Sequence, residues 1–234
     1  MYSCLLILCV YVGGHGVAAH NIVGPMLADY DVDTSFEGDN TVLMQQLSKA
    51  MLSDAQAALK NGDRSFLAAV RAPEPSSIND LSYLLALMNA RERVALQRLL
   101  KSMNDSPSKN AAVAFGENLD LALDAAWAFI ERDVFEVFLE RINQNPSIAE
   151  ILTVVARLFA LTLVEKNAAF YLHNRLFSSI TVDDVRVTIN GICGGLYKGG
   201  SALKLVEAFK FPDHVMPPVA FPDYIERYSY RARL

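Results

Sequence analysis

Cysteine, clustered basic residues and long apolar runs are all scarce in this sequence, and each scarcity excludes a class of protein. The three cysteines are Cys4, Cys9 and Cys193, and they form neither a CxxC pair nor a zinc-like spacing with histidine. We therefore expect reduced thiols, no disulfide framework and no metal site. The net charge is −5, and Lys and Arg are not clustered, so no nucleic-acid surface is expected.

The most apolar stretch, residues 5–12, lies near the N-terminus. It is too short for a membrane span, which needs about 20 apolar residues. Val17-Ala18-Ala19 resembles a signal-peptidase site, so secretion stays open as an alternative. No Lys or Arg precedes the apolar stretch, which favours an intracellular protein.

Hydrophobic residues make up 52% of the 234 residues and charged residues 20%, enough apolar material for a folded core. After Asn40 the apolar residues recur at every third or fourth position, and no stretch alternates with period two. The sequence therefore predicts an all-α fold. The expected helices cover 41–60, 80–101, 111–141 with a kink near Gly116, 147–166 or on to 176, 181–195, and 201–209, followed by an extended proline-rich tail. The expected core of 111–141 is Ala114, Phe115, Leu119, Leu123, Trp127, Ile130, Phe135 and Leu139.

Several local signals predict where helices begin and end. Asp39 and Asn40 are suited to cap the helix over 41–60. Ser147 with Glu150 three residues later has the spacing of a capping box. The glycines of 191–195 lack both the GK[ST] ending and the preceding strand of a phosphate loop, so they predict a helix break.

Two short motifs carry the chemistry. The first is Gly13-Gly14-His15-Gly16, whose glycines suit a sharp turn with accessible backbone amides. The second is 35–42, in which Glu37 is followed by Gly38, Asp39 and Asn40. A carboxylate beside a glycine suits proton abstraction from a bound substrate. Taken alone, the same residues also describe a surface turn before a helix.

These motifs, together with segments 29–34, 130–133 and 205–209, resemble the acyl-CoA oxidase family over most of the chain. The resemblance implies oxidation of fatty acyl-CoA to trans-2-enoyl-CoA in peroxisomal β-oxidation. It assigns Glu37 as the general base that removes the α-proton, with FAD accepting the β-hydride and O₂ reoxidising the flavin to give H₂O₂.

The resemblance also implies the cofactor-binding residues and the partners. They are Gly13, Gly14, His15 and Gly16, in contact with FAD of a neighbouring subunit, and Asp39 and Asn40, which follow the glutamate. A homodimer is implied as well. The final residues, Ala232-Arg233-Leu234, are similar to the peroxisomal address Ser-Lys-Leu and predict recognition by the import receptor.

The same resemblance divides the chain. Residues 1–60 are expected to be the final part of an acyl-CoA dehydrogenase-like helical bundle, 61–215 a second helical bundle, and 216–234 a tail with the targeting tripeptide. The family's N-terminal helical and β-barrel domains have no counterpart here, so we do not expect turnover from this chain by itself. Two alternatives stay open, a truncated non-catalytic dimerisation module and an acyl-CoA dehydrogenase.

Overall fold

The computed structural model describes residues 14, 18, 23–33, 36, 38–73, 77–176, 182–210 and 223. Every regular element within these residues is a helix, which confirms the all-α prediction. Contacts between residues divide the chain into two compact units. One is formed by residues 1–43 with 203–234, and the other by residues 44–202. The divisions fall inside α4 (Asn40–Lys60) and α11 (Ser201–Glu207). The expected domain bounds of 60 and 215 stay a prediction.

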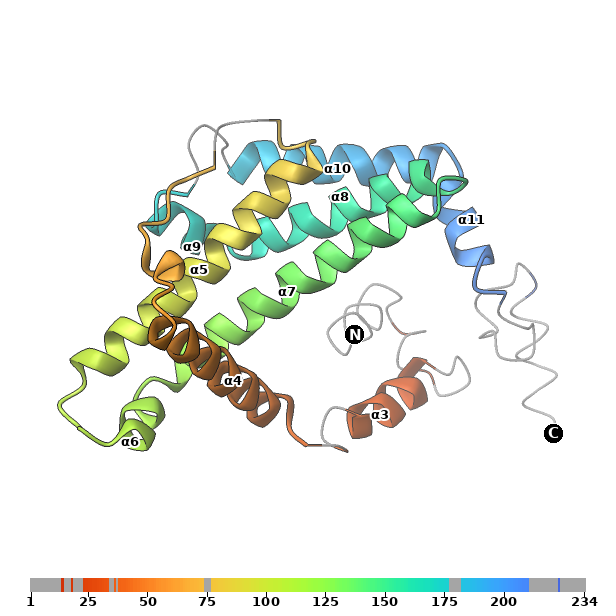
Figure 1. Cartoon of the computed structure of the whole chain (residues 1–234). Coiled ribbons are helices and arrows are strands. Elements are labelled where there is room, and N and C mark those ends of the chain that lie inside the picture. Colours follow the sequence, from red (N-terminus) through yellow and green to blue (C-terminus); the bar gives the residue numbers. More distant parts are fainter. Residues whose placement is uncertain are drawn as a thin grey trace. The chain divides into compact units, whose positions relative to one another are not determined.

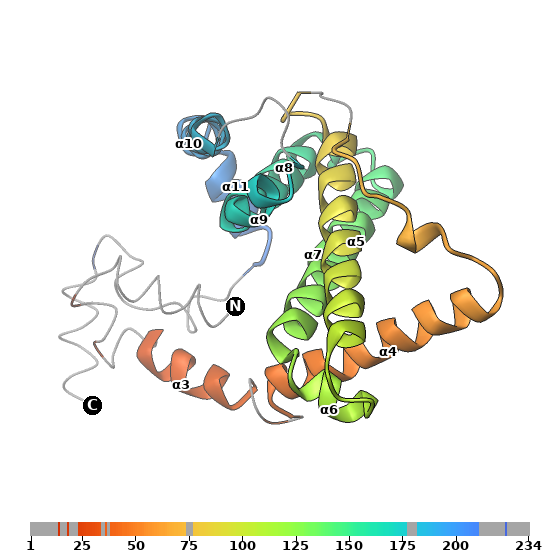
Figure 2. The same ribbon diagram turned by 90° about the vertical axis from the view of Figure 1, so that its left-hand side faces the viewer.

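The larger unit is built on long helices that lie side by side (Figures 1 and 2). These are α5 (Leu81–Asp105), α7 (Leu119–Gln144) and α8 (Ala149–Lys166), and each contacts the other two. The remaining elements of this unit are most of α4, η2 (Ser65–Leu67), α6 (Ala111–Gly116), α9 (Ala168–His173) and α10 (Val182–Lys198). α10 packs on α8, on the side away from α7 (Figure 2).

Two apolar clusters hold this unit together. One joins α5, α7, α8, α9 and α10 and is centred on side chains with almost no exposed surface, among them Leu84, Leu87, Phe135, Leu161 and Tyr171. The other joins α4 to α5, α6 and α7 through Met51, Leu52, Leu99, Phe115 and Ala125. Alanines line the α7 side of the second cluster, and small side chains let the neighbouring helices approach closely. Burial of this kind supplies most helix stability in a folded protein.

The predicted cap at Asp39 is confirmed, and side chains cap two further helices. Asp39 Oδ1 accepts a hydrogen bond from the Thr41 amide at 2.6 Å, and Asp80 Oδ1 accepts one from the Ser82 amide at 2.9 Å. Asn110 caps α6 in the same way. The capping box at Ser147 is wrong, because α8 begins after Ile148 and no side chain caps its N-terminus.

The predicted interruption near Gly116 is confirmed, since α6 ends there and α7 begins at Leu119. The predicted break at 191–195 is wrong, because α10 runs through these glycines to Lys198. One face of α10 packs on α8 through Val185, Ile189 and Ile192, and this burial outweighs a glycine cost of about 1 kcal/mol each. The chain instead turns at Gly200, where φ is +68°.

Trp127 is a third correction, because it is 43% exposed. It lies two residues from the buried Ala125, on the opposite side of α7. The Lys166 ammonium stands 5.8 Å from the centre of its ring. In the first turn of α4, Val42 and Leu43 are also exposed.

The smaller unit contains a helix that the sequence analysis missed, α3 (Val23–Asp33). Gly24 and Pro25 at its start have the composition of a turn. Proline is nevertheless tolerated in the first helical turn, because the amides there have no intrahelical acceptor. No described helix in either unit combines the length and the apolarity that a membrane crossing requires.

Candidate functional site

The glutamate motif leads into α4. Glu37 lies outside the described residues, and the description resumes at Gly38. Gly38 has φ of +118°, a backbone conformation that other residues rarely adopt. A Cβ placed there would lie 3.6 Å from Leu43 Cδ2, an ordinary contact. The glycine is therefore required by the backbone of the turn rather than by lack of space.

Asp39 and Asn40 fix the start of α4 directly after this turn. The Thr41 side chain and amide both hydrogen-bond Asp39, and this holds the pKa of its carboxyl below the usual range. Asp39 is therefore an ionised helix cap. Asn40 is the first residue of α4 and is exposed. Their predicted role in binding a cofactor stays a prediction.

Only Gly14 of the glycine motif is described. It is exposed, and among the described residues no heavy atom beyond its chain neighbours lies within 4 Å of the position that a Cβ would take. Gly13, His15 and Gly16 lie outside the described residues, as does Ala232-Arg233-Leu234. The relation between the two motifs therefore lies outside the described residues, and their joint role stays a prediction.

A buried charged cluster, which the sequence analysis did not assign, lies at the junction of α8 and α9. Glu131 of α7 accepts hydrogen bonds from Arg91 of α5, from Lys166 Nζ at 3.1 Å and from Asn167 Nδ2 at 3.3 Å. The Arg91 and Glu131 side chains are each only 8% exposed. One buried carboxylate thus joins α5, α7 and the α8–α9 turn.

Tyr171 is buried beside this cluster. Burial raises the pKa of its phenol, the Arg91 charge opposes this, and the Glu131 charge adds to it. The ring of Phe170 lies near two guanidinium groups, 6.0 Å from that of Arg91 and 5.6 Å from that of Arg98. The aromatic ring of Phe170 therefore joins the short helix α9 to α5.

A small pocket of about 210 Å³ opens beside the cluster, lined by Arg91, Asp124, Lys166, Asn167, Ala169 and Phe170. Its charged groups are of both signs, and the two cations already engage Glu131. Among the described residues no group of three His, Cys, Asp or Glu side chains is placed to hold a metal ion. The pocket therefore has the chemistry of a structural polar junction.

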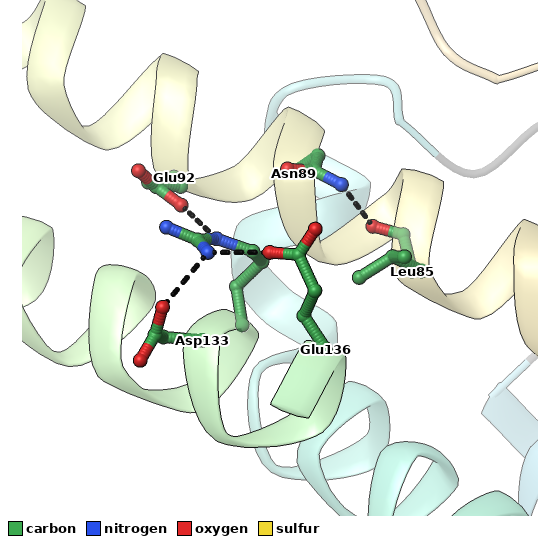
Figure 3. A network of polar contacts seen from close by, with 6 residues as sticks. Leu85, Asn89, Glu92, Asp133 and Glu136 are labelled. Atoms are coloured by element: carbon green, nitrogen blue, oxygen red, sulfur yellow. Dashed lines mark hydrogen bonds and ion pairs between the residues drawn. The ribbon is translucent and has the colours of Figure 1, made fainter. Parts of the chain in front are cut away.

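The next residue of α7, Arg132, is the centre of a second network (Figure 3). Its Nε donates to Glu92 at 2.7 Å, and its Nη1 donates to Glu136 at 2.8 Å and to Asp133 at 3.2 Å. Burial lowers the pKa of Arg132, but the hydrogen bonds and charges of Glu92 and Glu136 outweigh this, so its pKa is raised. This network lies at the edge of the α5–α7 interface.

Comparison with known proteins gives a consistent result along the chain. The sequence model of acyl-CoA oxidase matches residues 80–217, and that of the acyl-CoA oxidase C-alpha1 domain matches residues 8–52. Acyl-coenzyme A oxidase 3, peroxisomal, of Arabidopsis thaliana is 30% identical over 226 residues, which are 90% of this chain and 33% of that protein. The chain therefore spans about a third of the length of such a relative.

Solved structures share the fold. Acyl-CoA oxidase 3 from Yarrowia lipolytica superposes with a TM-score of 0.86 at 20% identity, over 99% of this chain and 35% of that one. Acyl-CoA oxidase-1 of Caenorhabditis elegans, solved in complex with FAD and ATP, gives a TM-score of 0.79 at 19% identity, over 89% of this chain and 33% of that one.

Proposed function

Because the chain belongs to the acyl-CoA oxidase family, we propose that it is the C-terminal portion of an FAD-dependent acyl-CoA oxidase. The complete enzyme would oxidise fatty acyl-CoA to trans-2-enoyl-CoA and pass the electrons to O₂, forming H₂O₂. The observation that carries this proposal is the order of the two family matches. The region matched by the C-alpha1 model, 8–52, contains both the glycine motif and the Glu37 motif, and the oxidase match follows it over 80–217.

Glu37 would act as the base of the reaction. Its carboxylate would take the α-proton of the acyl thioester, which requires a position within hydrogen-bond reach of the Cα–H and a site from which water is excluded. The left-handed turn at Gly38 and the Asp39 cap support this role, because they fix the chain immediately after the glutamate to the rigid start of α4.

FAD, when bound, would supply the hydride acceptor of this chemistry. The exposed Gly14 fits a contact with such a group, because its backbone is open where a side chain would stand. We propose that Gly13, Gly14, His15 and Gly16 contact the cofactor, with Asp39 and Asn40 next to the base. A homodimer, in which the glycine motif reaches the neighbouring subunit, is part of the same proposal.

The peroxisome is the proposed location. The Arabidopsis relative carries that location in its name, and Ala232-Arg233-Leu234 has the small, basic, leucine order of a peroxisomal address. Replacing Leu234 by Lys in a fluorescent fusion should leave the protein in the cytosol. Import that survives this change would contradict the assignment of the address.

The test of the reaction needs the chain in its full context. The transcript is first read upstream of Met1 for an in-frame β-barrel and helical segment, and the complete polypeptide is then assayed with acyl-CoA substrates of several chain lengths. We expect a flavin absorbance spectrum, oxygen consumption and an equal yield of H₂O₂. Electron transfer to an artificial acceptor without oxygen consumption would indicate an acyl-CoA dehydrogenase instead.

The Glu37→Gln variant tests the base directly. It should keep the flavin spectrum and lose turnover, because the amide cannot accept the α-proton. Glu150→Gln, in the exposed first turn of α8, is the control and should retain activity. Turnover that persists in Glu37→Gln would overturn the assignment of the base.

A non-catalytic helical module is the second candidate, and the observation that favours it is the share of the relative that the chain covers, 33%. The chain alone would then be a stable helical protein that dimerises and binds no FAD. If no upstream coding segment exists and the purified chain has no flavin spectrum, this second candidate replaces the first.

A further inference from the structure

The described buried side chains of α4 lie in the middle of the helix. The first turn, 40–43, is exposed, as are Gln56 and Ala57 toward the other end. Between these ends the buried side chains follow a spacing of three, one and three residues, which places them on one face of the helix. We call them the α4 anchor; they are Ser48, Met51, Leu52 and Ala55.

The anchor packs into the second apolar cluster. Met51 and Leu52 share this cluster with Leu99 of α5, Phe115 of α6 and alanines of α7. The Lys49 ammonium, next to the anchor, stands 5.3 Å from the centre of the Phe115 ring. Figures 1 and 2 show α4 at the α6 end of the long helices. The direction in which α4 points from the larger unit is therefore set by this one cluster.

The start of α4 is joined to the anchor by unbroken helix. α4 is continuous from Asn40 to Lys60, and the Leu43 amide donates to the Asp39 carbonyl at 3.0 Å, which ties the cap residue into the first turn. Leu52 lies 12 residues after Asn40, or about 18 Å along the helix axis at roughly 1.5 Å per residue. The Glu37 motif thus stands at the far end of a rigid arm.

Such an arm magnifies small changes at the anchor. A tilt of about 3° at Leu52 would displace the first residue of α4 by about 1 Å, given an arm of about 18 Å. A misplacement of about 1 Å can lower the rate of an enzyme by about a hundredfold, because the reacting atoms must be held in a narrow range of geometry. The packing of two apolar side chains can therefore control the position of a distant base.

We propose that Met51 and Leu52 are positioning residues for Glu37 and act on it through α4. This inference rests on the proposed function, in which Glu37 is the base. Since the two side chains are buried in the second cluster and far along the helix from the motif, they would affect the rate of proton abstraction rather than the binding of cofactor or substrate.

The test compares Leu52→Ala with Leu161→Ala in the complete polypeptide. Both changes leave a cavity in an apolar cluster, but Leu161 belongs to the first cluster, whose described members include no residue of α4. Leu52→Ala should lower kcat by tenfold or more with the KM for acyl-CoA and the flavin spectrum unchanged. Leu161→Ala should lose stability and, at a temperature where it is folded, keep kcat. An unchanged kcat in Leu52→Ala, or an equal loss in both variants, would overturn the proposal.

The conservative variant separates position from general damage. Leu52→Met keeps nearly the same side-chain volume, so the direction of α4 should be preserved. We expect Leu52→Met to recover most of the kcat that Leu52→Ala loses. A kcat no higher in Leu52→Met than in Leu52→Ala would contradict a role that depends on packing volume.

Hydrogen exchange tests the anchor without substrate or flavin. In the 234-residue chain, Leu52→Ala should speed exchange of the α4 amides by tenfold or more and leave those of α8 unchanged, and Leu161→Ala should do the reverse. Equal effects on both helices would overturn the anchor and the positioning role with it. A complete polypeptide that has no turnover before any substitution would instead overturn the proposed function, and the positioning role would fail for that separate reason.

Discussion

Two neighbouring ion pairs join α5 to α7 with their charges exchanged. Arg91 of α5 pairs with Glu131 of α7, and at the next position of each helix Glu92 pairs with Arg132. The first pair has side chains 8% and 8% exposed, and the second has 13% for the arginine and 20% for the glutamate. Arg and Glu thus pair at a more buried and at a less buried position, one residue apart along both helices.

The two networks also differ in which charge is shared. In the buried network one carboxylate, Glu131, receives three donors, from Arg91, Lys166 and Asn167. In the second network, called the outer network from here on, the guanidinium of Arg132 pairs with three carboxylates. When a shared buried group is removed, its partners stay buried without their hydrogen bonds or counter-charge. When a more exposed group is removed, water can hydrate its partners. The difference in burial should therefore decide the cost of each loss.

The largest effect is expected for Glu131→Ala, which leaves the Arg91 guanidinium buried without its carboxylate. We expect a loss of about 3–5 kcal/mol in the free energy of unfolding. Urea denaturation followed by circular dichroism measures it. Replacing both partners, Arg91→Met with Glu131→Leu, should recover most of the loss, because no uncompensated charge remains. A loss of less than about 1 kcal/mol for Glu131→Ala would show that burial does not set the cost.

The sequence did contain a signal for this pair. Arg91 lies seven residues after the buried Leu84 on α5, and Glu131 lies four residues before the buried Phe135 on α7. Each charge therefore interrupts an apolar helical face, and two opposite charges of that kind are best satisfied by each other. The missing information was which helices are neighbours, since the two residues lie 40 positions apart.

The second effect depends on pH and concerns Tyr171, next to the buried pair. Burial raises the pKa of its phenol in the folded state above the unfolded value of about 10. A raised folded pKa means that the stability is fully present below about pH 10 and is lost as pH rises further. Between pH 10 and 12 Tyr171→Phe should therefore lose stability more slowly than the unchanged chain, by about 1.4 kcal/mol per pH unit.

Tyr197→Phe is the control for this experiment, because Tyr197 is 82% exposed on α10. Its removal should leave the alkaline slope of the unfolding free energy unchanged. If both substitutions change the slope equally, burial beside Arg91 and Glu131 is not the cause.

The third effect is smaller and belongs to the outer network. Glu92→Ala should lower the free energy of unfolding by about 1 kcal/mol, because Arg132 keeps Glu136 and Asp133 as partners and remains in reach of water. Urea denaturation at low and high salt measures the loss and its screening. A loss as large as that of Glu131→Ala, with no salt dependence, would remove the distinction between the two pairs.

Much of the fold could be predicted from periodicity, and the failures have local physical causes. Helices α4, α5 and α7 follow apolar spacing closely, and the break near Gly116 follows from a weak helix former. The predicted break in α10 failed because packing on α8 compensates for its glycines. Trp127 was expected in the core because α7 has apolar residues on both faces, and the sequence alone does not tell the inner face from the outer one.

For the candidate site, the sequence predicts only the type of chemistry that its residues could perform. A glutamate beside a glycine indicates a base on a turn, and the left-handed Gly38 with its Asp39 cap agrees with a turn of that kind. Glu37 lies outside the described residues, and the chain spans about 33% of such a relative, so the groups around its carboxylate could not be predicted. Position and water exclusion govern the strength of a base, and neither follows from a local motif.

The smallest effect is expected for Glu136→Ala, at the outer edge of the Arg132 network. Glu136 is 48% exposed and pairs with Arg132 within one helix, four residues apart. Such pairs contribute about 0.3–0.5 kcal/mol, and high salt should remove most of that. Denaturation at two salt concentrations separates this value from the roughly 1 kcal/mol expected for Glu92→Ala. If Glu136→Ala costs more than Glu92→Ala, the carboxylate on α7 holds Arg132 more firmly than the one on α5. The outer network would then stabilise α7 itself rather than its contact with α5.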